Sequence, residues 1–157
     1  MSPVVQVLAS FSADHFNARG FHIIGLAILG FLGFIIAAEL PADAFATRYG
    51  CLIMAMSGMF ATIPPMLGWI SSNVYNTASV GLAIAINVST GGGIGQIPGV
   101  WIYKSSEATM GYPTGHRTNA GMMIAVAVGA LGLRIFYGWK NKQLKRAHPD
   151  GTQIYKL

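Results

Sequence analysis

Four long segments almost without charge constrain the fold of this chain more than any other feature. They are residues 21–40, 49–72, 77–103 and 118–138. Their only charged residues are Glu39, at the end of the first segment, and Arg134, near the end of the last. Each segment is long enough to cross a hydrocarbon layer of about 30 Å as a helix that rises about 1.5 Å per residue. Because apolar residues run around all faces, none resembles a surface helix of a soluble protein.

Composition supports the same fold class. Hydrophobic residues make up 53% of the 157 residues and charged residues only 10%, whereas soluble domains carry about 25% charged residues. We therefore predict an all-α membrane protein with a four-helix transmembrane region over residues 21–139. The short apolar start, residues 1–10, lacks the pattern of a signal peptide, and residues 140–157 form a basic tail.

The placement of basic residues predicts the orientation in the bilayer. An even number of spans puts both termini on one side. That side holds six basic residues, Arg19, Lys140, Lys142, Lys145, Arg146 and Lys156, and the other holds three, Arg48, Lys104 and Arg117. The positive-inside rule predicts cytoplasmic termini. The tail suits anionic lipid better than nucleic acid. Trp69 and Trp139 fit interfacial anchors or lipid-facing bulk equally well.

The run INVSTGGGIGQIPGVWIYK, residues 86–104, raises the question of what its five glycines do. It matches neither phosphate-binding glycine pattern, because no lysine follows in register and the third glycine of the dinucleotide pattern is replaced by Pro98. Gly91, Gly95 and Gly99 are spaced by four and form one ridge of a helix. Such a ridge lets another helix approach closely, although glycine is also simply frequent in membrane helices.

Prolines inside two spans predict bends. Pro98 lacks an N–H group and leaves the carbonyl of Ile94 without its usual donor. Pro64 and Pro65 are expected to bend the second span in the same way. Carbonyl groups freed at membrane depth need protein or a water-filled cavity around them. Two bent helices therefore favour moving or cavity-lining parts over a passive anchor.

Polar residues in the third span are candidates for a substrate cavity. Ser89 and Gln96 are spaced by seven and share a helix face, whereas Asn87 lies on the far side of an unbent helix. Amides in lipid are costly unless paired, so they usually face a bundle interior or an aqueous path. We place Ser89 and Gln96 at the cavity, with Asn87 as second choice. A purely structural hydrogen bond between helices is an equally good interpretation.

The sequence offers no catalytic set. Its acidic residues and histidines are scattered over both sides of the membrane, so neither a metal site nor a carboxylate pair is expected. We predict no enzyme activity and no cofactor.

Several of these stretches resemble one known family. They are W-x-x-S-N at residues 69–73, the polar and glycine-rich run at residues 87–96, and Y-P-T-G-H at residues 112–116. Together they resemble helices 10 to 12 of fungal major facilitator superfamily transporters, above all the allantoate permease branch of the anion:cation symporters. FSADHFNARG, residues 11–20, is similar to the cytoplasmic turn between helices 8 and 9. Asp14 and Arg19 match that turn, while His15 stands where the family usually has arginine or lysine.

The resemblance implies a C-terminal part of a twelve-helix fold. Residues 1–20 would be a truncated end of helix 8 with the cytoplasmic turn, and the four spans would be helices 9 to 12. It also implies a plasma-membrane symporter that moves small organic anions, such as allantoate, ureidosuccinate or vitamins, together with protons. This chain alone is expected to be inactive without the missing N-terminal helices or a partner chain. The alternative is a stand-alone four-helix membrane protein that is a structural or regulatory partner.

Overall fold

The computed structural model describes residues 2–16, 18–74, 76–147 and 155–157, and the side chains of residues 2, 3, 92, 94, 96 and 98 lie outside this description. All secondary structure in the described ranges is helical. The elements are α1 (Ser2–His15), α2 (Arg19–Glu39), α3 (Phe45–Ala61), α4 (Ile63–Asn73), α5 (Thr77–Ser89), the π-helix η1 (Thr90–Ile94), α6 (Gln96–Trp101), the 3₁₀-helix η2 (Ser105–Met110) and α7 (Pro113–Ala147).

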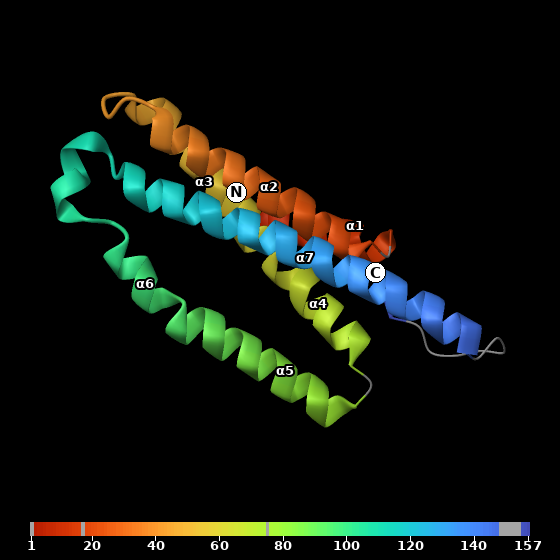
Figure 1. Ribbon diagram of the computed structural model, residues 1–157. Helices are drawn as coiled ribbons and strands as arrows, with labels where there is room; N and C mark the ends of the chain where they lie inside the picture. Colours follow the sequence, from red (N-terminus) through yellow and green to blue (C-terminus); the bar gives the residue numbers. More distant parts are fainter. Residues whose placement is uncertain (1, 17, 75, 148–154) are drawn as a thin grey trace.

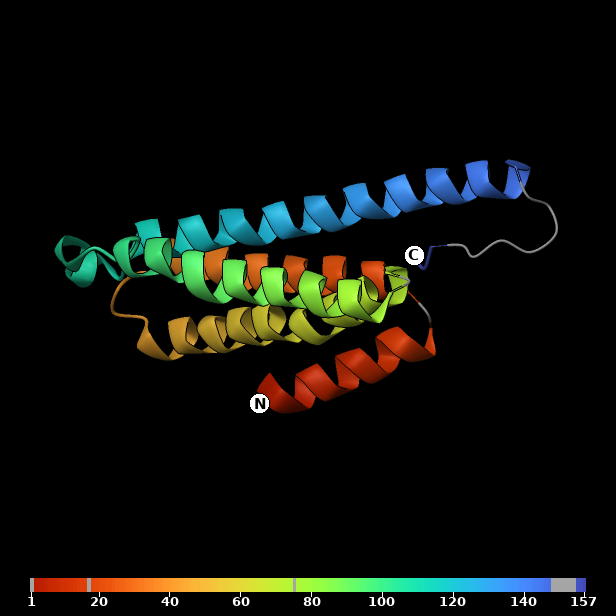
Figure 2. The same cartoon turned by 90° about the horizontal axis from the view of Figure 1, so that it is seen from below.

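Helix α2 forms the centre of the molecule and packs against both α3 and α7 (Figures 1 and 2). Its buried positions recur every three or four residues and include Ile23, Ala27, Gly30 and Phe34, the spacing that places side chains on one helix face. The principal core cluster joins α2 to Ala55 of α3 and to Ala120, Met123 and Ala127 of α7.

Glycines bring α2 and α3 into backbone contact. A Cβ atom added at Gly33 would lie 2.6 Å from the backbone nitrogen of Ala55, and one added at Gly58 would lie 2.5 Å from that of Gly30. Neither position has room for a side chain. Small residues at such crossings permit the close packing that holds membrane helices together.

The two predicted spans 21–40 and 49–72 correspond to α2 and to the pair α3–α4. Helices α3 and α4 meet end to end at Thr62, whose hydroxyl donates to the carbonyl of Met59 at 2.7 Å. Pro64 and Pro65 lie in the first turn of α4, where the missing N–H of proline costs little. The prolines thus stand where one helix stops and the next begins.

Residues 77–103, predicted as one span with a bend at Pro98, form a succession of shorter helical pieces. Helix α5 ends at Ser89, the π-helix η1 follows, and α6 ends at Trp101. The physical reason is local, because three consecutive glycines weaken the α-helix and Pro98 removes a hydrogen bond. Figure 1 shows α5 and α6 lying apart from the pair α2–α7.

The last helix is longer than predicted. Helix α7 runs from Pro113 to Ala147, whereas the predicted span covers only residues 118–138. The first part of the predicted basic tail is therefore helical, because lysine, glutamine, leucine and arginine are good helix formers and cations favour a helix C-terminus. Residues 148–154 of that tail lie outside the described residues.

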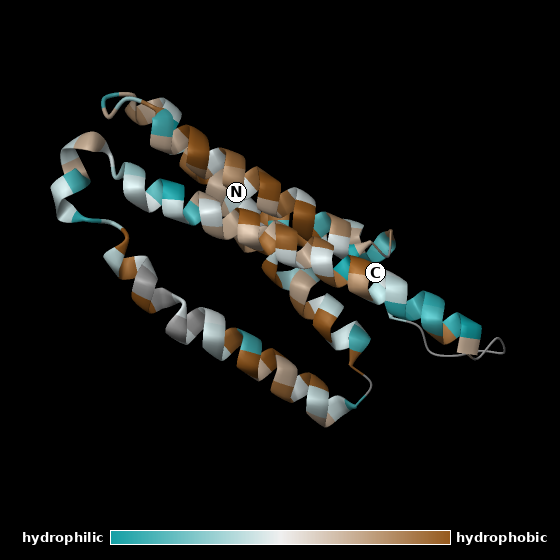
Figure 3. Cartoon of the chain, viewed as in Figure 1, coloured by the Kyte–Doolittle hydropathy of each residue, from teal (hydrophilic) through white to brown (hydrophobic). Residues whose placement is uncertain are grey.

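Three helical stretches among the described residues are long and apolar enough to cross a membrane, namely Arg19–Glu39, Phe45–Asn73 and Pro113–Ala147, and α5 is a shorter apolar helix. Many large apolar side chains on these helices are exposed rather than buried in the core. Val128 and Ile135 of α7, for example, are 63% and 64% exposed. Figure 3 shows the apolar middle of the bundle and the hydrophilic end of α7. This surface suits lipid rather than water.

Candidate functional site

The interrupted third span carries the three predicted cavity residues in different surroundings. Asn87 is half-buried and lines a cavity of about 640 Å³ between α4 and α5, together with Met66, Ile70 and Thr90. Ser89 is exposed and is not among the lining residues. Gln96 begins α6, and its side chain lies outside the described part of the chain. The structure thus puts Asn87, the second choice from sequence, at a cavity.

The π-helix gives this segment its irregular backbone. The N–H of Gly95 donates to the carbonyl of Thr90 at 2.9 Å, a five-residue step, and the hydroxyl of Thr90 donates to the carbonyl of Ile86 at 2.7 Å. The turn at Gly95 lies three residues before Pro98. Single π-turns of this kind often occur at functional sites.

The glycine ridge meets no other helix in the described chain. A Cβ atom added at Gly91 or Gly99 would find nothing within 4 Å, and one added at Gly95 would meet only the neighbouring turn, 2.6 Å from the carbonyl oxygen of Gly91. Helix packing by Gly91, Gly95 and Gly99 therefore stays a prediction about a partner outside this chain.

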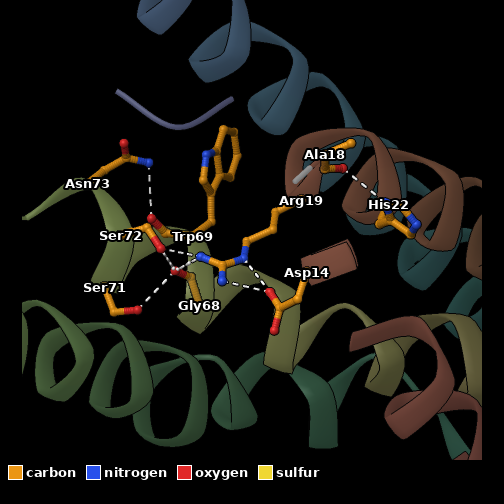
Figure 4. Close-up of polar contacts among 9 residues, drawn as sticks. All are labelled: Asp14, Ala18, Arg19, His22, Gly68, Trp69, Ser71, Ser72 and Asn73. Atoms are coloured by element: carbon orange, nitrogen blue, oxygen red, sulfur yellow. Dashed lines mark hydrogen bonds and ion pairs between the residues drawn. The ribbon is translucent and has the colours of Figure 1, made fainter. Parts of the chain in front are cut away.

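A cluster of polar contacts joins α1, α2 and α4 at the end of the bundle that carries Arg19, which we call the basic end (Figure 4). The guanidinium of Arg19 pairs with Asp14, with Nη2 and Oδ1 2.6 Å apart, and donates to the carbonyl of Gly68 at 2.6 Å and to the hydroxyl of Ser72. Asp14 and Arg19 were predicted from the sequence, whereas Gly68 and Ser72 were not. Both lie in or beside the W-x-x-S-N stretch, which was the available signal.

His15 takes no part in this cluster. Its ring stacks on Phe11 with centroids 6.3 Å apart and meets the edge of Phe16 at 5.2 Å. His22 is the histidine that contributes polar contacts here, because its Nε2 lies 2.9 Å from the hydroxyl of Ser12. The unusual residue in the turn therefore leaves the Asp14–Arg19 pair intact.

The final residues dock on the basic end. Asn141 pairs with the backbone of Tyr155 through two hydrogen bonds of 2.8 Å. Asn73 pairs with Lys156 in the same manner, at 2.7 and 3.2 Å.

Both interpretations of Trp69 from sequence are wrong. Its ring is buried, with 5% exposed, and its indole N–H donates to the carbonyl of Lys156 at 2.8 Å, so it is a core residue. Trp139 is 56% exposed.

At the opposite end of α2 lies a cavity of about 1190 Å³. Most of its lining is apolar, as with Phe34, Leu52, Met56 and Met59, and its polar lining includes Arg48, Tyr103, His116 and Asn119. Arg48 was predicted only to be a charge on the outer side of the membrane, yet its side chain is buried, with 8% exposed. The available signal was its position near the start of an apolar span, where a charge is costly.

The loop over this cavity is held by side chains. Glu107 accepts from the backbone N–H and the hydroxyl of Thr114 at 3.0 and 2.6 Å, and these hydrogen bonds hold the pKa of Glu107 below its ordinary value. Gly111 has a left-handed backbone with φ of 76°, a conformation that favours glycine, and its carbonyl accepts from Arg48. Among the described residues, no group of three His, Cys, Asp or Glu residues is placed to hold a metal ion.

Comparison with known proteins identifies transporters as relatives. The MFS (major facilitator superfamily) transporter prlL of Fungal sp. (strain NRRL 50135) is 54% identical over 155 residues, which are 98% of this chain and 31% of that protein. An uncharacterised transporter of Schizosaccharomyces pombe (strain 972 / ATCC 24843) is 28% identical over 142 residues, which are 90% of this chain and 28% of that protein.

The chain spans about a third of the length of the curated relatives that it matches. No family model and no solved structure matches it. The matched relatives are named as transporters, not enzymes. Over almost its full length, the chain is a homologue of a fungal MFS transporter, and it is an integral membrane protein.

Proposed function

We propose that this chain is the C-terminal membrane region of a secondary active transporter for small organic anions of the allantoate, ureidosuccinate or vitamin type. The single observation that carries the proposal is the 54% identity to an MFS transporter over 98% of the chain. The complete transporter is a proton-coupled symporter of the plasma membrane, with both ends of this chain in the cytoplasm. We expect the chain alone to be inactive, because it spans only 31% of the length of the prlL transporter.

In this proposal the interrupted span α5–η1–α6 is the part that contacts the substrate. Secondary transporters place substrates near the membrane midplane, between helices whose regular hydrogen bonding is broken. The π-helix at Thr90–Ile94 and the cavity beside Asn87 support this assignment. Ser89, Gln96 and Asn87 supply hydroxyl and amide groups that can hydrogen-bond an anion.

The pair Asp14–Arg19 has a mechanical role in the same proposal. It ties α1 to α2, and the further contacts of Arg19 with Gly68 and Ser72 tie α2 to α4. If α1, α2 and α4 move relative to one another during alternating access, these contacts of Arg19 must break in one state and form in the other. The cluster therefore stabilises one conformation of the basic end.

Uptake measurements test the transport proposal. The chain is expressed alone and joined to the part of the prlL transporter that it does not cover, and uptake of radiolabelled allantoate and ureidosuccinate is measured with and without a protonophore. We expect uptake only from the joined protein and its loss with the protonophore. Robust proton-coupled uptake by the chain alone would contradict the proposal.

Substitution in the joined protein tests the assigned residues. We expect Gln96→Ala to lower uptake about tenfold, because a lost hydrogen bond to a charged group costs about 1.5–3 kcal/mol, while abundance in the membrane stays unchanged. Ser79→Ala in α5 is the matched control, because it removes a hydroxyl from the same span away from the cavity. A parallel fall in abundance and uptake would make Gln96 structural.

The alternative proposal is a stand-alone membrane protein that associates with a partner through its glycine ridge. The open space at Gly91 and Gly99 supports it. Gly99→Leu tests this association better than Gly95→Leu does. A side chain at Gly95 would clash with the carbonyl of Gly91 in its own helix. Crosslinked dimers that disappear with Gly99→Leu favour this alternative, and a monomer unaffected by the substitution counts against it.

A further inference from the structure

Tyr155 and Lys156, which we call the docked residues, bridge two helices that pack little against each other. Helix α7 packs mainly on α2, and its contact with α4 includes the edge of Tyr137 against Trp69, with ring centroids 5.9 Å apart. The ring of Tyr155 stacks on Tyr137 with centroids 4.9 Å apart. Trp69 donates to the carbonyl of Lys156 at 2.8 Å. The docked residues therefore reinforce a limited contact between α4 and α7.

Each helix holds a different docked residue. Asn141 of α7 engages both the N–H and the carbonyl of Tyr155. Asn73 of α4 does the same for Lys156. Because the docked residues are joined to each other by a peptide bond, the two attachments lie in series. The link from α4 to α7 through the docked residues is intact only while both attachments are closed.

The same end of α4 is held on its adjacent face by Arg19. This arginine contacts Gly68 and Ser72, whereas Trp69 and Asn73 hold the docked residues. Each pair is spaced by four and lies on one helix face, and the two faces are about 100° apart. Figure 4 shows both pairs at the end of α4. Helix α4 is thus tied to α1 and α2 on one face and to α7 on the other.

The attachment of the docked residues is of a kind that can open. Each hydrogen bond replaces one to water and gives only a small net gain. Fixing each residue in one conformation costs entropy, which opposes docking. Lys156 is exposed and Tyr155 is only half-buried, so docking buries limited apolar surface. These opposing contributions favour docking that is reversible.

We propose that the docked residues are a conformational latch that joins α4 to α7 and closes the basic end of the bundle. When either attachment opens, α4 is free to move away from α7, while α7 remains packed on α2. The parts of this latch all lie within this chain. Its use in transport rests on the proposed function, in which the latch is closed in one state of alternating access and open in the other.

Distances between spin labels test the latch in the whole chain, reconstituted in lipid bilayer discs. The labels are attached to cysteines placed at Ser71 of α4 and Gln143 of α7, both exposed, in a chain that carries Cys51→Ala. We expect one narrow distance. Asn141→Ala is expected to broaden the distribution and add a longer distance. Hydrogen exchange of the Trp69 indole N–H should become at least about fivefold faster, because two hydrogen bonds to the docked residues are lost.

The series arrangement gives a sharper test. Asn73→Ala is also expected to broaden the distance between α4 and α7. The double variant is expected to match Asn141→Ala, because docked residues already detached from α7 cannot transmit a second loss. Arg146→Ala is the matched control, since Arg146 is exposed on the same helix as Asn141, and it should keep the narrow distance. A double variant clearly broader than Asn141→Ala would show two independent contacts and overturn the proposal.

A second pair of labels separates release of the latch from unfolding. With labels at Ile28 of α2 and Gln143 of α7, the distance is expected to stay narrow in every variant, because these helices keep their own packing. An unchanged distance between α4 and α7 in Asn141→Ala overturns the proposal. Equal broadening of both pairs also overturns it, because the docked residues then stabilise the whole bundle. No transported substrate enters these measurements, so the transport proposal succeeds or fails separately.

Discussion

The pair α2–α3 and the segment α5–η1–α6 are both rich in glycine, yet they use glycine in opposite ways. In the pair, Gly33 and Gly58 lie where one helix backbone touches the other. In the segment, Gly91 and Gly99 face open space within this chain. The comparison teaches that spacing alone does not identify a packing glycine. What matters is whether the chain itself supplies a second helix to cover the ridge.

The largest expected effect is at the α2–α3 contact. We expect Gly58→Val to lower the free energy of unfolding by about 3 kcal/mol, because its Cβ would lie 2.5 Å from the backbone nitrogen of Gly30 and overpacking of this kind costs about 1–3 kcal/mol or more. Thermal unfolding in detergent measures it. Gly50→Val, on the same helix, is the matched control because nothing lies within 4 Å of its added Cβ. Equal losses would remove the contrast between packed and open glycines.

A second effect is expected where α4 leads into the open segment. We expect Asn73→Ala to lower the free energy of unfolding by about 2 kcal/mol, because it removes both hydrogen bonds to Lys156 and each contributes about 0.5–1.5 kcal/mol. Protease cleavage near the C-terminus should accelerate. The control is Asn76→Ala, just before α5. It removes only the side-chain acceptor for the N–H of Ala78, so it should leave that cleavage unchanged. Unaltered cleavage in Asn73→Ala would show that the docked residues are held by other contacts.

The third prediction separates the middle glycine of the ridge from its neighbours. Gly95→Ala would bring a Cβ 2.6 Å from the carbonyl of Gly91, so we expect it to destabilise the π-turn by about 1–3 kcal/mol of local opening free energy. Hydrogen exchange of the α5 and α6 amides measures this. Gly99→Ala meets open space and should slow exchange, since alanine favours helix over glycine. Faster exchange in both variants would contradict this distinction.

The smallest effect is expected at the ion pair between α2 and α7. Arg117 and Glu39 are 2.9 Å apart, but both side chains are about 60% exposed. Exposed pairs contribute about 0–1 kcal/mol, so Glu39→Gln should change the free energy of unfolding by less than about 1 kcal/mol. Chemical denaturation in detergent is the measurement. A loss as large as that of Gly58→Val would show that this pair, not helix packing, holds α7 to the core.

The helical class and three of the four spans could be predicted from the sequence, because long segments almost without charge have few alternatives to a membrane helix. The π-helix that interrupts the third span could not be predicted, because hydropathy does not report how three consecutive glycines weaken an α-helix locally. The end of α7 was missed for the opposite reason. Its last turns are polar but helix-forming, and hydropathy marks only the lipid-facing part.

The residues of the candidate site also divide into those that could be predicted from the sequence and those that could not. Asp14 and Arg19 could be proposed because they are close in sequence, but their contacts with Gly68 and Ser72 depend on residues about 50 positions away. Arg48 was overlooked as a buried cation because its guanidinium packs against Gly111, which is 63 positions away in the sequence. The burial of Trp69 likewise depends on α2, α7 and the final residues. Tertiary contacts of this kind leave no local pattern.

The docked C-terminal residues are recognised by their peptide groups rather than by their side chains. A carboxamide has the same donor and acceptor as a peptide bond, so Asn73 and Asn141 imitate two rungs of a β-ladder. Hydrogen bonds to backbone groups do not depend on which side chains the bound residues carry. Lys156 should accept almost any replacement without loss of docking, with proline as the exception, because proline has no N–H to offer Asn73.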